Sequence, residues 1–322
     1  MKKYIILAVV VGILIASGYA MAKDSTRLQK KADKTGTLSV PTLIPGNIFS
    51  GDYIRIGINN GGTLGVTGTT TNDPGVGFQS RYDTPFSSVK STESIATGSW
   101  IEGYIVGYKT SVANKKAYWH PDLGYPPPAA SYITIVSNSI LKNDGNKSVK
   151  KTVVKTKDNK LMLNFTWTFY KRYPEVSLET IITNIGSETL ENIIYKRTAD
   201  INVCGSAGNN WTSSADSAYA WTYCSGLDGE QDQITMSGRD GINAPVSYVD
   251  LDSWEDFILT TPGFSTIQSE AMPKLGDYAP SIYYKIGDLN IKQSKTVYTV
   301  YQTNMRKFFP PIMGNGGGKN IG

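Results

Sequence analysis

Histidine and cysteine are almost absent from this sequence, and charged residues are sparse. Among 322 residues there is one histidine, His120, and Asp, Glu, Lys and Arg together make up 18%. A metal site built from several histidines is therefore excluded, and a Ser-His-Asp site would have to use His120. No Gly-x-Ser-x-Gly nucleophile motif accompanies it, so we interpret His120 as a structural or surface residue.

Long apolar runs are also missing, except at the start of the sequence. Lys2 and Lys3 precede the run Ile5–Ala16, and Ala20–Ala22 follows with the A-x-A pattern of a cleavage site. This order of charge, apolar segment and small residues is typical of a secretory signal peptide. We therefore predict a signal peptide over residues 1–22 and a mature protein that is secreted to the extracellular cell surface.

The alternative for this segment is an uncleaved membrane anchor. The stretch Tyr4–Ala22 approaches the roughly 20 apolar residues that span a bilayer. The cleavage pattern and the polar residues from Lys23 onward favour removal. Since no second apolar run of this length follows, we expect no contact with a membrane after cleavage.

Neither sign of charge is in large excess. The formal net charge is +5, which is too small to predict a nucleic-acid partner. The only basic cluster of note runs from Lys142 to Lys160. We interpret it as the solvated face of strands, where lysines also protect sheet edges from pairing.

Apolar and polar residues alternate along much of the chain. In the stretch 161–169 every second residue is large and apolar: Leu161, Leu163, Phe165, Trp167 and Phe169. Period two predicts a half-buried antiparallel strand, and Asp158-Asn159 before it predicts a hairpin turn. Similar signals predict strands at Tyr53–Ile58, Trp100–Lys109, Tyr132–Ile140, Trp254–Thr261, Ile282–Ile286 and Lys295–Thr303. With hardly any helical periodicity, they predict an all-β fold, a large antiparallel β-sandwich of two packed sheets.

The sandwich region is predicted over residues 51–307. Before it, residues 23–50 form an N-terminal extension in which Leu38–Ile44 alternates apolar and polar residues and is a candidate donor strand. After it, residues 308–322 form a Gly-rich C-terminal tail. Two arrangements of the sandwich region remain open: one large domain, or two halves near 51–142 and 150–303.

Two covalent modifications are predicted for an exported chain. Cys204 and Cys224 are the only cysteines, and in an oxidising compartment we expect them to form a disulfide. Asn146, Asn164 and Asn210 each begin an Asn-x-Ser/Thr sequence. They are candidate glycosylation sites, which would mark surface positions of a glycoprotein.

Parts of the sequence resemble known families. Val176–Ile194 is similar to the strand–turn–strand phrase of secreted β-sandwich modules in prokaryotic surface, adhesin and cell-wall proteins. Gly57–Gly65, with Gly75–Gly77 and Trp100–Gly103, is similar to the opening of larger sandwich domains on such proteins. The resemblance implies a fold and an extracellular location. Such double-sheet sandwiches are also similar to sugar-mutarotase-like and glycosidase-associated domains, whose mutarotase-type site uses histidines with a carboxylate.

One acidic segment is a candidate metal site. Asp228, Glu230 and Asp232 alternate, and oxygen ligands at alternate positions are typical of the start of a calcium loop. The rest of the segment departs from the calcium-loop pattern, because Gln233 stands where such a loop needs Gly and Arg239 where it needs Glu. A solvated acidic turn is the alternative. Calcium is the one cofactor that the sequence suggests.

Aromatic residues gather between the two cysteines. Trp211 lies in a Gly/Ser/Asn-rich stretch, and Tyr219, Trp221 and Tyr223 follow at alternate positions. Alternate residues share a strand face, so these three predict an aromatic face that would bind a glycan or another partner beside Asn and Ser. The alternative is a face packed in the core, where aromatic residues dominate the packing energy.

Two functions fit these patterns. The first is a secreted, non-enzymatic structural protein that self-associates into an extracellular filament or layer, with Leu38–Ile44 adding to a neighbour's sheet edge. The alternative is a carbohydrate-binding sandwich in which Trp211, Trp221 and Tyr223 stack on sugar rings. Acidic residues around Trp254 leave a glycosidase as a weaker variant, because glycoside cleavage needs two carboxyl groups across the sugar.

Overall fold

The computed structural model of this chain consists mainly of antiparallel strands in its described residues. The described residues are 46–66, 75–80, 94–95, 102–119, 133–199, 201–203, 209–213, 217–223, 231–239, 246–252, 274–276 and 279–303. In several strands between 114 and 276, only the backbone path and pairing are described for some or all residues. The signal peptide, the candidate donor strand, His120, both cysteines, the strand at Trp254–Thr261 and the C-terminal tail lie outside these ranges and stay predictions.

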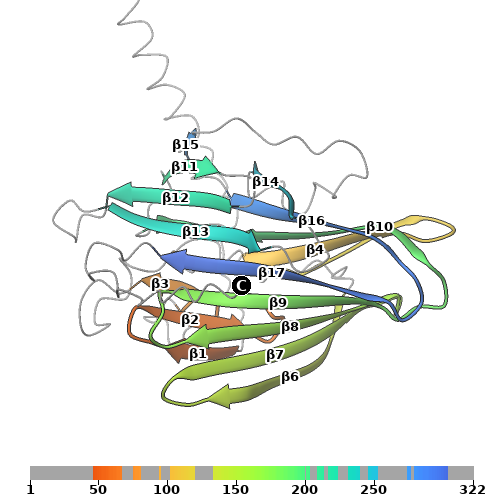
Figure 1. Cartoon of the computed structure of the whole chain (residues 1–322), viewed down its shortest axis with the longest axis horizontal. Coiled ribbons are helices and arrows are strands. Elements are labelled where there is room, and N and C mark those ends of the chain that lie inside the picture. Colours follow the sequence, from red (N-terminus) through yellow and green to blue (C-terminus); the bar gives the residue numbers. More distant parts are fainter. Residues whose placement is uncertain are drawn as a thin grey trace, which may run out of the picture. The chain divides into compact units, whose positions relative to one another are not determined.

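The described part of the chain contains seventeen strands and no α-helix. A three-stranded sheet has the order β1 (Gly46–Ser50), β2 (Ile54–Asn59), β3 (Phe78–Ser80). A five-stranded sheet has the order β14 (Val246–Asp252), β16 (Ala279–Leu289), β10 (Leu190–Ala199), β4 (Glu102–Lys109), β5 (Asn114–Trp119). A nine-stranded sheet has the order β15 (Lys274–Gly276), β11 (Asn209–Ser213), β12 (Ser217–Tyr223), β13 (Gln231–Arg239), β17 (Ser294–Thr303), β9 (Glu175–Asn184), β8 (Leu161–Tyr170), β7 (Lys147–Thr156), β6 (Ile133–Asn143) (Figure 1).

All strand pairs in these sheets are antiparallel. The predicted all-β sandwich is therefore confirmed. Within the described ranges, no helix has the length and apolar character needed to cross a membrane.

The alternation in residues 161–169 produces β8 and its buried face. Its large apolar residues are at most 1% exposed: Leu161, Leu163, Phe165, Trp167 and Phe169. The residues between them are half-buried on the other face. In the turn before β8, Asn159 has a φ of 55°, a left-handed conformation that Asn tolerates better than most residues. The predicted strand and hairpin are both confirmed.

The core lies on the face of the nine-stranded sheet that carries Phe165 and Trp167, which we call the inner face. The five-stranded sheet packs there, because the Tyr104 ring of β4 lies 4.7 Å from the Phe165 ring between centroids. The three-stranded sheet and the loop after β2 also pack there: Lys150 of β7 donates to the carbonyl oxygen of Ile58 (2.7 Å), and Trp167 Nε1 donates to that of Gly62 (3.1 Å). Burying each large apolar side chain stabilises the fold by roughly 1.5–3 kcal/mol.

Strands from the two stretches 51–142 and 150–303 share the same sheets. β4 pairs with β10, and β6 pairs with β7, so each sheet that they form draws on both stretches. The first strand, β1, begins inside the predicted N-terminal extension and pairs with β2. Five predicted strands appear within a few residues of their expected bounds, as β2, β4, β6, β16 and β17.

Candidate functional site

The predicted aromatic face lies on β12 of the nine-stranded sheet. Tyr219, Trp221 and Tyr223, which we call the aromatic row, occupy alternate positions of this strand. On β13 the row is paired with Thr235, Gln233 and Gln231. On β11 its first two residues are paired with Thr212 and Asn210. Hydroxyl and amide residues therefore occupy the register positions on both sides of the aromatic row.

Strand β13 decides which face of the sheet the aromatic row belongs to. Ala218 and Ala220, which alternate with the row, pair with Met236 and Ile234, and both of these partners are 0% exposed in the core. Paired residues share a face, while neighbours along a strand take opposite faces. The register therefore assigns the aromatic row to the outer face, opposite to the core. On that face the described neighbours Ser217, Thr235 and Val300 are 5%, 9% and 2% exposed.

Trp211 is separated from the aromatic row by the sheet itself. It pairs with Ala220 and so belongs to the inner face, with Ile234 and Met236. The sequence suggested that Trp211, Trp221 and Tyr223 would stack on sugar rings. The register assigns Trp211 to the face opposite to that of the other two. Spacing within a loop-rich stretch could not decide this, because the face of Trp211 depends on how β11 pairs with β12.

The aromatic row continues across the outer face as a line of paired residues. Tyr219 pairs with Thr235, Thr235 with Gln302 of β17, and Gln302 with Glu175 of β9. Phe169 of β8 pairs with Val176, so Tyr170 follows one step further beside Glu175, and Tyr170 pairs with Lys147 of β7. We call this line the outer row: Tyr219, Thr235, Gln302, Glu175, Tyr170 and Lys147.

The far end of the outer row carries two exposed tyrosines. Tyr170 is 45% and Tyr173 55% exposed, and their rings meet edge to face with centroids 6.0 Å apart and an interplanar angle of 84°. The Lys147 ammonium lies 4.8 Å from the centroid of the Tyr170 ring. Sequence reasoning missed this pair, although Tyr170 follows the polar positions of the β8 alternation and was therefore readable as an outward residue.

Backbone hydrogen bonds hold the turn that carries these tyrosines. Lys171 N–H donates to the carbonyl of Asn146 (2.9 Å), and the Lys171 carbonyl accepts from Asp52 N–H (2.7 Å). Thr303 N–H of β17 donates to the Pro174 carbonyl (3.0 Å). The turn is therefore fixed to three other segments, which reduces the conformational entropy that a ligand would have to remove on binding.

A charged pair is sealed in the core beneath the same sheet. Glu102 of β4 and Arg197 of β10 are both 0% exposed and form a bidentate contact. Tyr301 Oη (2.7 Å) and Leu64 N–H (2.6 Å) also donate to the Glu102 carboxylate. Arg197 donates further to the Gly62 carbonyl (3.0 Å). Sequence reasoning missed this pair, because its members are far apart in the chain and follow no motif.

The chemistry of the buried pair is structural. Burial raises the pKa of Glu102, while Arg197 and the hydrogen bonds from Tyr301 and Leu64 act in the opposite direction. Four donors fill the acceptor positions of an ionised carboxylate, and a protonated carboxyl could not accept all of them. Both groups are 0% exposed, so Glu102 has neither a free acceptor position nor solvent access through which to exchange a proton with a substrate.

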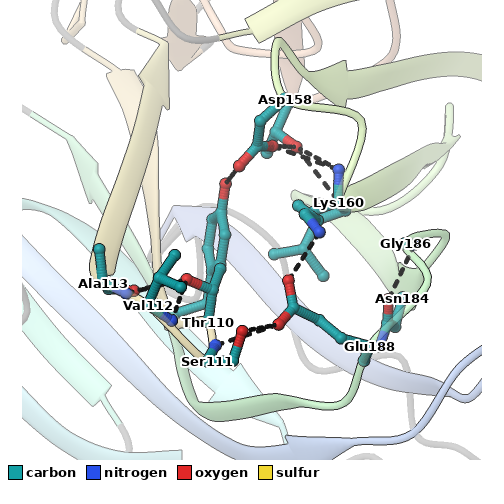
Figure 2. Close-up of polar contacts among 12 residues, drawn as sticks. Thr110, Ser111, Val112, Ala113, Asp158, Lys160, Asn184, Gly186 and Glu188 are labelled. Atoms are coloured by element: carbon teal, nitrogen blue, oxygen red, sulfur yellow. Dashed lines mark hydrogen bonds and ion pairs between the residues drawn. The ribbon is translucent and has the colours of Figure 1, made fainter.

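A second polar cluster joins the two larger sheets at the opposite end of β8, as Figure 2 shows. Tyr108 of β4 donates to Asp158 (2.8 Å), and Glu188 accepts from Lys160 (2.6 Å) and from the Ser111 hydroxyl (2.5 Å). These hydrogen bonds lower the pKa of Glu188 to about 2, that from Lys160 most. A general acid of a glycosidase needs a raised pKa, so Glu188 does not fit that role, and its contacts with Lys160 and Ser111 clamp the two sheets together.

The other predicted site residues are placed only in part. Asn146 is exposed in the β6–β7 turn, and Asn164 is half-buried on the outer face of β8. Asn210 lies in β11, and Asp232 lies in β13 opposite Thr222. Asp228, Glu230, Cys204 and Cys224 fall outside the described residues. No group of three or more potential metal-binding residues occurs within the described ranges, and the calcium site, the disulfide and the glycans stay predictions.

Comparison with known proteins gives similarity in fold only. No protein-family model and no curated protein matches the sequence. The structure is similar to a bacterial glucoamylase complexed with acarbose (TM-score 0.46, 8% identity, 84% of this chain and 34% of that chain). It is also similar to Slr1438 from Synechocystis (0.43, 9%, 84% and 99%) and to a putative aldose 1-epimerase from Escherichia coli K12 (0.36, 9%, 81% and 99%). The chain spans about a third of the length of the glucoamylase, and at these values the likeness says nothing about activity.

Proposed function

We propose that this chain is a secreted, non-catalytic carbohydrate-binding protein that holds a glycan on the outer face of its nine-stranded sheet. The observation that carries the proposal is the register of β12, which assigns the aromatic row to the face opposite the core. Sugar rings offer apolar C–H faces and a rim of hydroxyls. Aromatic side chains suit the apolar C–H faces, and the amide and hydroxyl residues paired with the aromatic row suit the sugar hydroxyls.

Three carboxylates of the described residues are held in structural contacts, which supports binding without catalysis at these three positions. Glu102 is sealed against Arg197, and Asp158 and Glu188 are held by hydrogen bonds at the clamp between the sheets. The signal-peptide pattern of residues 1–22 supports an extracellular location, where polymeric glycans are the expected ligands.

Isothermal titration calorimetry of residues 23–322 against a panel of soluble polysaccharides tests the proposal. For a glycan that binds, Trp221→Ala and Tyr219→Ala are expected to weaken binding about tenfold or more each, as loss of a stacking contact would. Met162→Ala, at the opposite end of the outer face of β8, is the matched control and is expected to bind normally. Binding that survives both aromatic substitutions, or no binding to any glycan, would overturn the proposal.

A second candidate function, self-association by strand addition, is favoured by the edge strand β6. This strand ends the nine-stranded sheet and has four partly exposed apolar residues: Ile135, Val136, Ile140 and Leu141, at 38%, 53%, 44% and 60%. An unpaired, apolar edge is a template for another strand. The pairing of β6 with β7 is irregular around Val136 and Leu141. Because such irregularities oppose pairing at a sheet edge, only the few residues between them could pair regularly with another strand.

Light scattering on the mature protein tests this second candidate. The predicted donor is Leu38–Ile44 of a neighbouring copy. Removal of residues 23–45 is expected to convert polymers into monomers, and Val136→Lys at the edge is expected to do the same. Polymers that persist in both variants, or a mature protein that is already monomeric, would contradict strand donation.

A further inference from the structure

The turn after β8 carries the two exposed aromatic side chains of the described residues, Tyr170 and Tyr173. Tyr173 N–H donates to the Tyr170 carbonyl (3.0 Å), so both residues belong to one tight turn. Their rings stand nearly perpendicular, at 84°, with centroids 6.0 Å apart. The Lys147 ammonium lies 4.8 Å from the centroid of the Tyr170 ring. We call these two rings and the Lys147 ammonium the tyrosine corner.

The tyrosine corner is open to solvent and fixed in place. Tyr170 is 45% and Tyr173 55% exposed, whereas Thr235, further along the outer row, is 9% exposed. Backbone hydrogen bonds hold the turn to three other segments. Exposed rings on a fixed turn provide contact area to a ligand at little cost in conformational entropy. The tyrosine corner therefore has the accessibility that the middle of the outer row lacks.

Two cations at the tyrosine corner have no acid partner. Neither Lys147 nor Arg172 forms an ion pair within the described residues, whereas Lys142 at the end of β6 is paired with Asp144 at 2.9 Å. Arg172 is an exposed residue of the turn itself, between the two tyrosines in the sequence. Glu175, which follows at the start of β9, is half-buried. The exposed charge on this turn is therefore positive.

The exposed acid Asp52 approaches this end of the sheet from its other side. Its N–H donates to the Lys171 carbonyl (2.7 Å), and a Cβ on the preceding Gly51 would lie 2.6 Å from Cζ of Phe169. Phe169 is an inner-face residue of β8 and is 1% exposed, whereas Tyr170 takes the outer face. The β1–β2 turn, with Asp52, therefore packs on the inner side, away from the two rings.

From these contacts we infer that the tyrosine corner binds an acidic sugar, that is, a uronic acid unit of a polysaccharide. Such a unit carries an apolar C–H face, which suits the Tyr173 ring, and a carboxylate, which suits the Arg172 guanidinium and the Lys147 ammonium. Nucleic acid is a weaker fit, because its dense phosphates call for more cations than these two. The inference takes from the proposed function only that the ligand is a glycan, and its site is separate from the aromatic row.

Isothermal titration calorimetry with oligogalacturonate, in which every ring bears a carboxylate, tests the inference. The control ligand is the same oligosaccharide with its carboxyl groups methyl-esterified, which keeps the rings and removes the charge. At low salt we expect the acid form to bind the mature protein about tenfold more tightly than the ester. The difference is expected to shrink as salt is added, since interactions between exposed charges are screened.

Two substitutions separate the contribution of the ring from that of the charge. Tyr173→Ala is expected to weaken binding of both forms about fivefold, while Tyr173→Phe keeps the wild-type affinity. Arg172→Gln is expected to weaken binding of the acid form about fivefold and to leave that of the ester unchanged. Lys155→Gln, at the opposite end of β7, loses the same charge and is expected to bind like wild type. Near-identical thermal unfolding of these variants excludes a folding defect.

Separate outcomes distinguish this inference from the proposed function. No binding of oligogalacturonate, equal affinity for its two forms, or unchanged binding in Tyr173→Ala overturns the acidic-sugar site. If Trp221→Ala loses a glycan that Tyr173→Ala still binds, the site is overturned and the proposed function stands. If Tyr173→Ala loses oligogalacturonate and Trp221→Ala binds it normally, the site stands and the aromatic row is not needed for this glycan. Single-stranded DNA or an acidic peptide that binds as tightly as oligogalacturonate would also overturn the assignment to a sugar.

Discussion

The two faces of the nine-stranded sheet are built from alternate residues of the same strands, yet they differ in almost every property. On β8, the inner residues from Leu161 to Phe169 are at most 1% exposed, while the outer residues are half-buried and Tyr170 is 45% exposed. The inner face also packs against a buried charged pair, Glu102 and Arg197 of the five-stranded sheet, whereas the outer face carries polar and charged residues and the two exposed rings at the end of β8. The comparison indicates that the inner face maintains the fold, whereas the outer face is open at the end of β8 and covered at Ser217, Thr235 and Val300, which are 5%, 9% and 2% exposed.

The inner face nevertheless depends on polar groups. Arg197 lies 5.0 Å from the Trp167 ring centroid and bonds Glu102 and the Gly62 carbonyl, so one guanidinium connects three parts of the core. A buried ion pair adds little stability over an apolar substitute, because desolvation opposes the attraction between its charges. Removal of one partner, in contrast, strongly destabilises the fold, because the other charge then stays buried without a counter-charge.

The largest effect is expected from breaking this pair. Arg197→Met is expected to lower the free energy of unfolding by about 3–5 kcal/mol, because Glu102 keeps its burial and loses its counter-charge. Urea denaturation measures the change. Lys109→Met, which removes the partner of Glu191 in an exposed pair, is the control and is expected to have little effect. An Arg197→Met protein as stable as wild type would show that the inner face does not depend on the pair.

A smaller loss is expected at the loop that covers the inner face. Gly62 has a φ of 82°, and a Cβ there would lie 2.6 Å from Cδ2 of Phe165. Gly62→Ala is therefore expected to cost about 1–3 kcal/mol through backbone strain, with the clash adding to it. Gly145→Ala is the matched control, because a Cβ there meets nothing within 4 Å. Equal melting temperatures for the two variants would contradict the docking of this loop on Phe165.

The third expected effect is a dependence on pH that arises from Lys150 on the inner face. Burial lowers the pKa of Lys150 to about 8. Between this value and the ordinary lysine value of about 10.5, the unfolded chain binds more protons than the folded one, so the free energy of unfolding rises with pH in that window. Buried tyrosines oppose this only above about pH 10, because burial raises their pKa values.

Urea denaturation at about pH 7.5 and about pH 9.5 measures this slope. Lys150→Met is expected to remove the Lys150 contribution and to leave a flatter profile. Lys151→Met, next to it on the outer face, is the control and is expected to keep the wild-type slope. A slope that is the same in Lys150→Met and in wild type would mean that this lysine is not titrating in the window.

The smallest change in stability is expected on the outer face. Tyr173→Ala is expected to alter the free energy of unfolding by less than about 0.5 kcal/mol, since the ring is 55% exposed. A loss of stability comparable to that of Gly62→Ala would instead make the Tyr170–Tyr173 contact part of the scaffold and would remove the contrast between the two faces.

Part of the fold could be predicted because strands leave a local pattern. The alternation that places Phe165 and Trp167 on one face is set by backbone geometry, in which successive side chains take opposite faces. The hairpin at Asn159 is equally local. The short strands β1, β3 and β15 left no such pattern, because three to five residues are too few to show a period.

The candidate site was predictable only in part, because its assembly is not local. The alternation of Tyr219, Trp221 and Tyr223 was readable from the sequence, but not the face that they occupy, since that depends on Ile234 and Met236 of the next strand. The contact between Glu102 and Arg197 could not be predicted from the sequence either. Both belong to strands that pair across more than ninety residues of sequence.

The sequence by itself determined the strands with a clear period of two, their turns and their division into two faces, because these follow from interactions between residues close in the chain. Only the tertiary structure decided which face became the core, which charges were buried together and which aromatic residues came to share the outer row. The physical reason is that strand order arises from hydrogen bonds and packing between distant segments, and no local pattern records which segments will meet.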